Sequence, residues 1–389
     1  KCPPLRFPEF ADEWKQTTLG ETCSVIGGGT PSTDVDDYWN GDIQWFTPSE
    51  IGVNKFVSRS ERTITEQGMN NSGAKLLPLG TILLTTRATI GEASIATCPC
   101  TTNQGCQSLV INRRITTTEF VYQKVETLKR ELFSRANGST FKEISASEVR
   151  SIPISLPSLA EQEKIASFLS LIDERIQSCS ETIKEIKTLK AGLLSLRVYQ
   201  ADKQYVPLSY FGEMKHGYPF KSTSYDEDGT HRIVTISNVS GARYADMSKC
   251  NYLAELPHDI QQHQILSRND ILISLTGNVG RVSFCLADGD LLNQRVGVLS
   301  LCDEAYKEYI YQVLSDWRFE MSMVACGQGA AQLNISKSNV EGYLVPYEQS
   351  EYQEIGNFFS LLDDRIEIEE ALLKQYEMQK KYLLRQMFI

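Results

Sequence analysis

The 389-residue sequence lacks the short motifs of the common catalytic folds. It contains no Gly-x-Gly-x-x-Gly after a strand-like run, no P-loop for phosphate and no Gly-x-Ser-x-Gly nucleophile turn. Residues 27–31 (Gly-Gly-Gly-Thr-Pro) are glycine-rich, but no lysine and no helix-like run follow them, so we interpret them as a tight loop. We therefore expect no catalytic residues in this chain.

Metal-binding patterns are also scarce. Histidine occurs only four times, always in the second half, and the spacing of His258 and His263 does not place them on one helical face. The ten cysteines form no Cys-x-x-Cys pair, and only Cys98, Cys100 and Cys106 cluster. These three either bind zinc or remain reduced, partly buried thiols, and the missing pair spacing favours the second interpretation. We expect no metal and no cofactor, and reduced thiols fit a cytoplasmic protein.

Long apolar runs and basic segments are missing too. No apolar run approaches the ~20 residues of a membrane span, and the first residues lack the apolar stretch of a signal peptide. We therefore expect no membrane contact. The formal net charge is −10, and no part of the chain is a basic domain. This charge alone argues against a protein that binds nucleic acid through bulk electrostatics.

A long internal repeat is present. Residues 170–176 (Ser-Leu-Ile-Asp-Glu-Arg-Ile) return at 360–366 (Ser-Leu-Leu-Asp-Asp-Arg-Ile), and a second Asn-Gln pair, at 293–294, matches the one at 103–104. A period of about 190 residues is far longer than the ~20–50 residues of solenoid units. The chain therefore contains two copies of a domain and of the segment that follows it, which predicts approximate two-fold symmetry and a target with two parts.

Each copy predicts a mixed α/β domain followed by one long helix. Strand-like runs such as 80–86 and 270–275 alternate with Gly, Asn and Pro turns, and amphipathic stretches at 120–132 and 309–321 predict helices. Proline-containing extended segments end each domain. We predict two globular domains and two helical segments, at residues 1–157, 158–200, 201–346 and 347–389.

Both long segments carry an apolar heptad pattern, sustained over about 40 residues or about 60 Å of helix in the first copy. Either each helix packs on its own domain, or the two helices pair with each other; the length of the seam favours pairing. The predicted seam consists of Ile165, Leu169, Ile172, Ile176, Ile183, Ile186 and Leu193 in the first helix, and Ile355, Phe359, Leu362, Ile366, Leu373, Tyr376 and Leu383 in the second.

Lys190 and Lys380 occupy the same heptad position in the two helices. A parallel pair would place these like charges together, so we predict an antiparallel pair with Cys179 facing Glu369. In that register Lys190 lies near Glu351 and Glu354, and Lys380 near the N-terminal acids of the first helix, Glu161 and Glu163. Alternatively, both lysines extend to solvent. Antiparallel pairing would set the two domains apart by more than the ~34 Å turn of B-DNA.

Amide, hydroxyl and arginine side chains are the remaining candidates for function, because Asn and Gln can pair with adenine and Arg with guanine. The shared Asn-Gln pairs are either base contacts or turn residues, and the positions that differ between copies are the better readout candidates. The DNA-binding candidates are Thr30, Ser32, Trp45, Arg87, Asn103, Gln104 and Lys142 in the first copy, and Lys221, Arg243, Asn278, Arg281, Gln294, Arg295 and Gln332 in the second.

Several of these segments occur together in one known family. They are residues 5–10 (Leu-Arg-Phe-Pro-Glu-Phe) with Trp14, 28–32 (Gly-Gly-Thr-Pro-Ser), 38–45, 83–91, the Gly138-Ser139-Thr140 turn, and 161–166 leading to 171–173. Their order resembles the DNA-specificity subunit of type I restriction-modification enzymes. Each motif alone is weak, but the series covers nearly the whole chain, in two copies.

The resemblance implies two target-recognition domains that each read one half of a split double-stranded DNA site. It also implies that the helices set the distance between the two domains and bind two methylation subunits. Restriction subunits would join this complex, and this chain would not itself be an enzyme. The second copy departs from the pattern, because Gly217-Tyr218-Pro219-Phe220 replaces the Gly-Gly-Thr-Pro loop, which indicates a different half-site. Since the methylation subunits would supply phosphate contacts, we expect weak DNA binding by the chain alone.

Two other functions compete with this interpretation. A coiled-coil scaffold that presents two protein-binding domains would explain the acidity but not the series of motifs. A DNA mimic would need denser acidic faces than the nearly neutral first domain offers.

Overall fold

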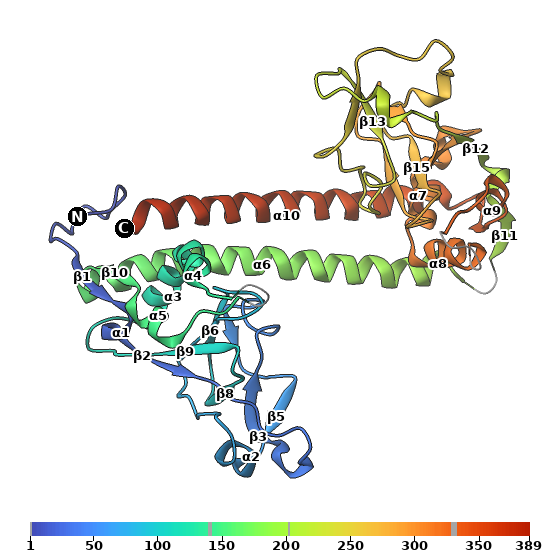
Figure 1. The fold of residues 1–389 in the computed structure, drawn as a ribbon. Coiled ribbons are helices and arrows are strands. Elements are labelled where there is room, and N and C mark those ends of the chain that lie inside the picture. Colours follow the sequence, from blue (N-terminus) through green and yellow to red (C-terminus); the bar gives the residue numbers. More distant parts are fainter. Residues whose placement is uncertain (1, 139–141, 201–202, 328–332) are drawn as a thin grey trace. The chain divides into compact units, whose positions relative to one another are not determined.

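The computed structural model describes residues 2–138, 142–200, 203–327 and 333–389. It divides into two compact units, Lys1–Cys179 with Leu372–Ile389, and Ser180–Ala371 (Figure 1). Two long helices, α6 (Leu159–Arg197) and α10 (Tyr352–Met387), contribute to both units. The rest of each unit is a mixed α/β domain, as predicted.

The first unit contains a five-stranded sheet in the order β2-β9-β6-β7-β4, a three-stranded sheet β5-β3-β8 and a two-stranded sheet β1-β10. Its fully buried run Ile82-Leu83-Leu84-Thr85 forms the central strand of the large sheet, as a continuous apolar segment predicts. The strands are β1 (Lys15–Thr18), β2 (Cys23–Gly27), β3 (Trp39–Phe46), β4 (Phe56–Val57), β5 (Arg62–Ile64), β6 (Ile82–Thr85), β7 (Ala93–Ala96), β8 (Cys100–Thr102), β9 (Cys106–Ile111) and β10 (Pro153–Leu156).

Short helices complete the first unit. They are α1 (Leu19–Thr22), η1 (Asp36–Tyr38), α2 (Glu66–Asn70), α3 (Thr118–Thr127), α4 (Lys129–Arg135) and α5 (Ala146–Ser151). Thr117 and Ser145 cap α3 and α5 through their side-chain oxygens. The stretch predicted to be helical at 120–132 is helical, but a break at Leu128 divides it into α3 and α4.

The second unit repeats the topology. Its sheets have the orders β12-β18-β15-β16, β14-β13-β17 and β11-β19, which match those of the first unit strand for strand apart from β4. The strands are β11 (Gln204–Pro207), β12 (Gly212–His216), β13 (His231–Val234), β14 (Asn251–Leu253), β15 (Ile271–Ser274), β16 (Val282–Phe284), β17 (Leu291–Leu292), β18 (Val296–Leu301) and β19 (Leu344–Tyr347).

The short helices of the second unit follow the same order. They are η2 (Leu208–Tyr210), η3 (Ser222–Ser224), η4 (Gln262–Gln264), η5 (Glu304–Tyr306), α7 (Lys307–Leu314), α8 (Trp317–Cys326) and α9 (Lys337–Glu341). Asp316 caps α8 by accepting a hydrogen bond from the Arg318 amide, so the predicted helix 309–321 is also two helices.

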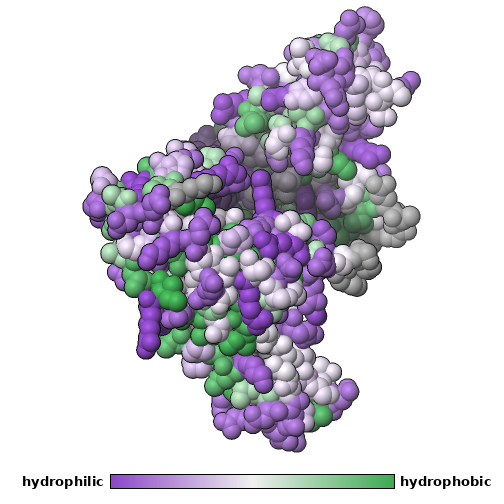
Figure 2. Space-filling model, turned by 60° about the vertical axis from the view of Figure 1, so that its left-hand side comes forward, coloured by the Kyte–Doolittle hydropathy of each residue, from purple (hydrophilic) through white to green (hydrophobic). Residues whose placement is uncertain are grey.

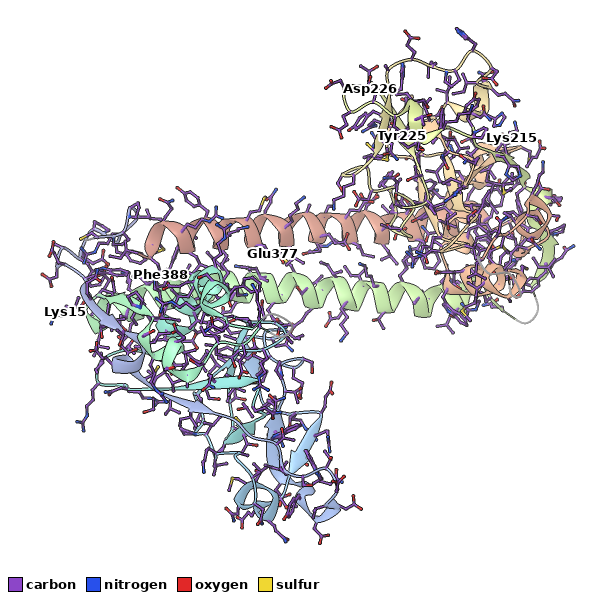
Figure 3. The ribbon with its side chains drawn as sticks, in the orientation of Figure 1. Lys15, Lys215, Tyr225, Asp226, Glu377 and Phe388 are labelled. Carbon is purple, nitrogen blue, oxygen red and sulfur yellow. The ribbon has the colours of Figure 1, made fainter. Side chains whose placement is uncertain are left out.

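The long helices run antiparallel within each unit, as predicted. In the first unit Asp173 of α6 binds Lys380 of α10 while Ile165, earlier in α6, shares an apolar cluster with Met387, later in α10. Phe388, labelled in Figure 3, lies just beyond α10 and packs on Phe120 in the same cluster. In the second unit Lys187 binds Glu370 and Lys190 binds Asp363, so the numbering again runs in opposite directions.

The described residues contain no helix long and apolar enough to cross a membrane. They also contain no group of three His, Cys, Asp or Glu side chains placed to hold a metal ion. Cys100 and Cys106 are buried free thiols, and burial raises the pKa of each to about 12. These two thiols of the Cys98–Cys106 cluster are therefore protonated at neutral pH and poorly reactive.

Candidate nucleic-acid interface

Four segments of the first domain meet at one end of its large sheet. The Gly29 amide donates to the Thr102 carbonyl over 2.9 Å, and the Thr86 amide donates to the Gly105 carbonyl over 2.8 Å. The Ile144 amide donates to the Thr86 carbonyl over 3.1 Å. We call the exposed side of these segments (residues 28–32, 86–91, 103–105 and 142–144) the first loop surface.

Four predicted contact residues lie on the first loop surface. Thr30 and Gln104 are exposed, and the Thr30 hydroxyl donates to the Gln104 side-chain oxygen. Arg87 is half-exposed and pairs with Glu143 over 2.8 Å, while the ammonium group of Lys142 lies 4.1 Å from the centre of the Phe133 ring. These four residues present one hydroxyl, one amide and two cations from separate segments.

Of the other three candidates of the first copy, Trp45 and Asn103 have structural roles, whereas Ser32 is exposed on the first loop surface and makes a contact through its backbone. Trp45 is buried, and its indole donates to the Gly29 carbonyl over 2.9 Å, which supports the glycine loop from beneath. The side-chain oxygen of Asn103 accepts from the Gly105 amide over 2.9 Å, so Asn103 is a turn residue. The Ser32 carbonyl accepts from the Trp39 indole over 3.0 Å.

The second domain has an equivalent end with different side chains. The Leu275 amide donates to the Arg295 carbonyl over 2.9 Å and the Ile335 amide to the Leu275 carbonyl over 3.0 Å, matching the bonds around Thr86. These segments surround a hollow of about 740 Å³, which we call the second loop surface. Its polar side chains include His216, Thr276, Gln294, Arg295, Asn334 and Lys337.

Gln294 and Arg295 are thus the predicted contacts that line this hollow, and Asn278 is exposed on the neighbouring 276–280 turn. Lys221 is exposed beyond the Gly-Tyr-Pro-Phe loop. Arg281 lies against α8, where its guanidinium is 3.5 Å from Glu320. Gln332, together with Ser139, Thr140 and the stretch Gly329-Ala330-Ala331, lies outside the described residues.

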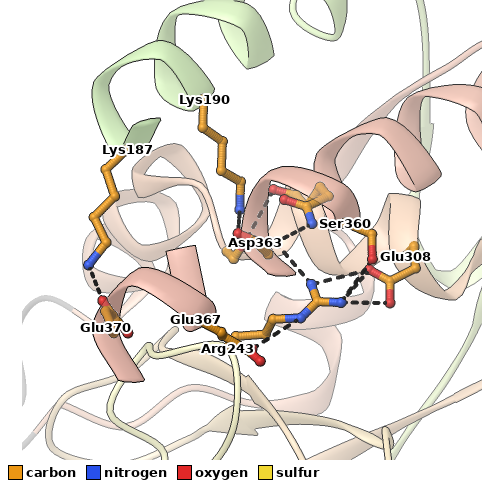
Figure 4. A network of polar contacts seen from close by, with 10 residues as sticks. Lys187, Lys190, Arg243, Glu308, Ser360, Asp363, Glu367 and Glu370 are labelled. Carbon is orange, nitrogen blue, oxygen red and sulfur yellow. Dashed lines mark hydrogen bonds and ion pairs between the residues drawn. The ribbon is translucent and has the colours of Figure 1, made fainter. Parts of the chain in front are cut away.

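Arg243 does not belong to either loop surface. Its guanidinium is 10% exposed and contacts Glu308 and Asp363 over 3.1 and 2.9 Å (Figure 4). Burial opposes its charge, but these two carboxylates raise the pKa of Arg243. A guanidinium engaged in this way is not available for guanine, so we leave Arg243 out of the proposed DNA contacts.

The sequence reasoning did not identify His216, Asn334 and Lys337. His216 ends β12 directly before the Gly-Tyr-Pro-Phe loop, and Lys337 begins α9 after the repeated Ile-Ser pair. The repeated motifs could have revealed these residues in the sequence, because residues next to a turn that both copies share lie at the same end of the domain as that turn. Lys337 pairs with Glu213 and lies 3.6 Å from Glu341, so it is a partly neutralised cation.

Backbone conformation at the first loop surface predicts a measurable strain. Ala88 has a φ of +56°, where its counterpart Gly277 has +75°. A side chain in this left-handed region costs about 1 kcal/mol, and Ala88 is exposed, so no packing offsets it. We expect Ala88→Gly to raise the free energy of unfolding by about 0.5–1 kcal/mol in urea denaturation.

The reverse change is the control. A Cβ at Gly277 would have only an ordinary contact, 3.8 Å from Ile236. Gly277→Ala should therefore destabilise by about 1 kcal/mol through the backbone alone. Equal effects of the same sign from both substitutions would contradict this explanation.

The seam positions named from the sequence are all buried or half-buried. Ile165, Leu169 and Leu383 share one apolar cluster with Phe120 of the first domain, and Phe359 shares another with Leu314 of the second. The helices therefore pack on each other and on their domains, so the two packing interpretations are not exclusive. Cys179 and Glu369 fall in different units, and their facing remains a prediction.

The predicted partners of the two seam lysines were wrong. Lys190 binds Asp363 over 2.5 Å, and Lys380 binds Asp173 over 2.7 Å. Glu161 instead pairs with Arg6 and accepts a hydrogen bond from the Trp14 indole. Glu351 pairs with Lys203. Since both lysines are engaged and mostly buried, extension to solvent was wrong as well.

Comparison with known sequences identifies the family. The profile described as "Type I restriction modification DNA specificity domain" matches residues 11–188 and, separately, residues 201–378. The chain belongs to this family. The family expected from the motif series is thus confirmed, and the specificity domain is present in two copies.

Curated relatives are specificity subunits. The chain is 38% identical over 170 residues to the type I restriction enzyme MjaIX specificity subunit of Methanocaldococcus jannaschii, covering 43% of this chain and 39% of that protein. It is 30% identical over 184 residues to the EcoR124I/EcoR124II specificity subunit of Escherichia coli, covering 46% and 45%. The chain thus spans less than half the length of these two relatives in the matched regions.

Solved structures share the fold over the whole chain. The S subunit of the type I restriction-modification system from M. genitalium has a TM-score of 0.65 at 18% identity, covering 100% of this chain and 99% of that one. A chain from a structure on complex assembly and conformational transition of the type I R-M system has a TM-score of 0.54 at 16% identity, covering 98% and 97%. The mixed α/β architecture with two domains and long helices is that of specificity subunits.

The helices of this specificity subunit carry exposed apolar residues that are themselves repeated. Leu171 and Leu361 are 60% and 67% exposed, and Phe168 and Phe358 are their exposed neighbours in the two copies. In the second unit a groove of about 490 Å³ is lined by Leu193, Phe358 and Leu361. On the face drawn in Figure 2, groups of apolar residues lie among mainly hydrophilic ones.

Proposed function

We propose that the chain is the non-catalytic DNA-recognition subunit of a type I restriction-modification complex. Each specificity domain reads one half of a bipartite double-stranded site through its loop surface. The observation that carries this proposal is that the two domains share their strand order but differ in the side chains on their loop surfaces. The strand order is shared by both domains. On the loop surfaces, by contrast, Thr30 and Arg87 of the first copy are replaced by Pro219 and Thr276 in the second, and Gly105 is replaced by Arg295.

The side chains on the two surfaces are suited to base edges. Amide, hydroxyl and guanidinium groups supply the hydrogen bonds that distinguish base pairs in the major groove. Their number is small and the chain has a net charge of −10, so phosphate contacts must come largely from partner subunits. Nanomolar specific binding by the isolated chain at physiological salt would contradict this division of roles.

We further propose that two methylation subunits dock on the helices, with restriction subunits joining them, in the cytoplasm. Repeated exposed apolar residues support docking of two like partners, because unpaired apolar side chains at equivalent sites gain most from burial. The groove beside Phe358 and Leu361 is the candidate contact in the second unit. Methyl transfer and its cofactor then belong to the partners, and this chain needs none.

One experiment tests the central proposal. The full chain is co-expressed with its methylation subunit, and modified adenines are mapped across the host genome. A bipartite motif with a fixed spacer supports the proposal. A contiguous motif, or no modification from a complex that assembles, would contradict it and favour a scaffold that presents protein-binding domains.

Docking can be tested apart from DNA. Leu361→Asp places a charge in the groove, and we expect at least about tenfold weaker association with the methylation subunit in a titration. Leu189→Asp is a matched control, because Leu189 is also exposed, on α6, but Gln379 replaces it in the other copy. Equal weakening by both variants would argue against docking at repeated positions.

A further inference from the structure

A single carboxylate joins four elements of the second unit. Asp363 of α10 accepts through Oδ1 from Lys190 of α6, over 2.5 Å. Through Oδ2 it accepts from Gln312 of α7 over 2.7 Å and from Arg243, which precedes β14, over 2.9 Å (Figure 4). One oxygen thus binds the opposite helix, and the other binds the globular domain.

The first unit contains the same junction. Asp173 of α6 pairs through Oδ1 with Lys380 of α10 over 2.7 Å. Its Oδ2 accepts from Gln123 of α3 over 2.7 Å and from Lys55 over 3.1 Å. The division between the two oxygens is the same as at Asp363, although the roles of α6 and α10 are exchanged.

The outer contacts of the two junctions also correspond. Lys55 donates to the Ser170 hydroxyl over 2.9 Å and pairs with Glu119 over 2.7 Å. Arg243 makes the equivalent contacts with Ser360 over 3.0 Å and with Glu308. Each cation also lies 5.4 Å from the ring centre of an equivalent tyrosine, Tyr122 or Tyr311, according to the unit.

Lys55 and Arg243 occupy equivalent places in the fold. An aromatic residue follows each of them and forms a parallel bridge to the next strand of the sheet. Phe56 pairs with Ile95 of β7, and Tyr244 pairs with Phe284 of β16. The two junctions therefore differ in the cation, lysine or arginine, and in Glu367, which lies 3.6 Å from Arg243 where the first copy has Gln177, whereas their other members are the same.

Stability alone does not explain such a buried network. Asp363 is 9% exposed and Lys190 18%. Burial lowers the pKa of Lys190 even with Asp363 beside it, and burial raises the pKa of Glu308. Buried ion pairs often contribute no more than apolar packing would, and their best-supported role is to select one arrangement. The network is therefore better suited to fixing geometry than to adding stability.

We propose that Asp173 and Asp363 are positioning residues, each of which fixes the orientation of its own recognition domain on the helix pair and so limits the spacer lengths that the chain accepts. The proposal rests on the function proposed above. Adding one base pair to a spacer lengthens the DNA by about 3.4 Å and rotates the half-site by about 35°. A domain that turned freely on its helices would tolerate that change, whereas a domain held by both carboxylate oxygens would not.

The test compares spacers in the assembled methylation complex. Substrate duplexes carry the native bipartite motif with its own spacer or with one base pair added or removed. The readout is the ratio of methylation rates on native and altered spacers. For Asp363→Asn, which keeps the shape but removes the charge, we expect this ratio to fall by about tenfold relative to the unsubstituted complex.

Two variants that should keep the native ratio serve as controls. Arg243→Lys places the cation of the first junction in the second and should retain the native ratio. Lys187→Met removes the exposed pair with Glu370 on the same two helices and should also retain it. A change of similar size in either control would overturn the proposal, because it would assign spacer choice to charge in general.

The outcomes separate this inference from the function on which it rests. Bipartite methylation with an unchanged ratio in folded Asp363→Asn would overturn the inference alone. Absence of bipartite methylation by the unsubstituted complex would overturn both. If Asp363→Asn does not fold, Gln312→Met removes the one uncharged donor from the same carboxylate, and an unchanged ratio there overturns the inference.

Discussion

Truncation of Phe359 to alanine is expected to destabilise the second unit by about 3–5 kcal/mol. Phe359 is 0% exposed and belongs to the cluster that joins α10 to Leu194 of α6 and to Leu314 of α7. Its loss would leave a cavity where both long helices and the domain meet. Urea denaturation followed by far-ultraviolet circular dichroism measures the change, as a shift of the transition of this unit to lower denaturant.

The preceding residue supplies the control. Phe358 is 46% exposed, so Phe358→Ala removes the same number of atoms from the same helix with little cavity. We expect a change within about 0.5 kcal/mol. Equal destabilisation by the two variants would mean that the core of the second unit does not extend to α10.

The second large effect is expected on DNA specificity. Arg295 is exposed and lines the second loop surface, where it is suited to contact a base edge. Arg295→Ala in the methylation complex should cost about 1–3 kcal/mol, or about 5- to 150-fold in methylation rate, and relax the requirement at one base of a single half-site. The other half-site should keep its sequence, because it is read by the other domain. Methylome mapping of the variant measures both.

Arg281→Ala is the matched control for this prediction. Arg281 belongs to the same domain but lies 3.5 Å from Glu320 of α8, so its removal should leave the motif unchanged. If Arg295→Ala instead lowers the methylation rate equally on all sequences, Arg295 contacts a phosphate and not a base. Relaxation in both half-sites would contradict the assignment of one domain to each.

Several features followed from local sequence. The buried strands at 82–85 and 271–274 lie where continuous apolar runs predicted them, and the turn after β8 follows Cys100–Thr102 at Asn103 as expected. The antiparallel direction of α6 and α10 followed from the like charges at one heptad position. These are properties of neighbouring residues or of a regular period, which the sequence displays directly.

The helix breaks and the lysine partners did not follow from periodicity. An amphipathic pattern continues through Leu128 although the helix does not, because a turn residue can lie on the apolar face. The register of the helix pair differed because Glu161 and Glu351 bind cations elsewhere in the chain, Arg6 and Lys203. Competition among carboxylates for a limited set of cations depends on which side chains the fold brings together.

The sequence by itself determined the family, the duplication, the buried strands at 82–85 and 271–274 and the helix direction. Tertiary structure alone decided which polar residues face outward and which are internal. Arg243 and Arg295 are the same residue type, yet only packing makes the first a partner of Asp363 and leaves the second exposed. The physical reason is that an arginine's role is set by the carboxylates within about 4 Å of it, and these come from distant parts of the chain.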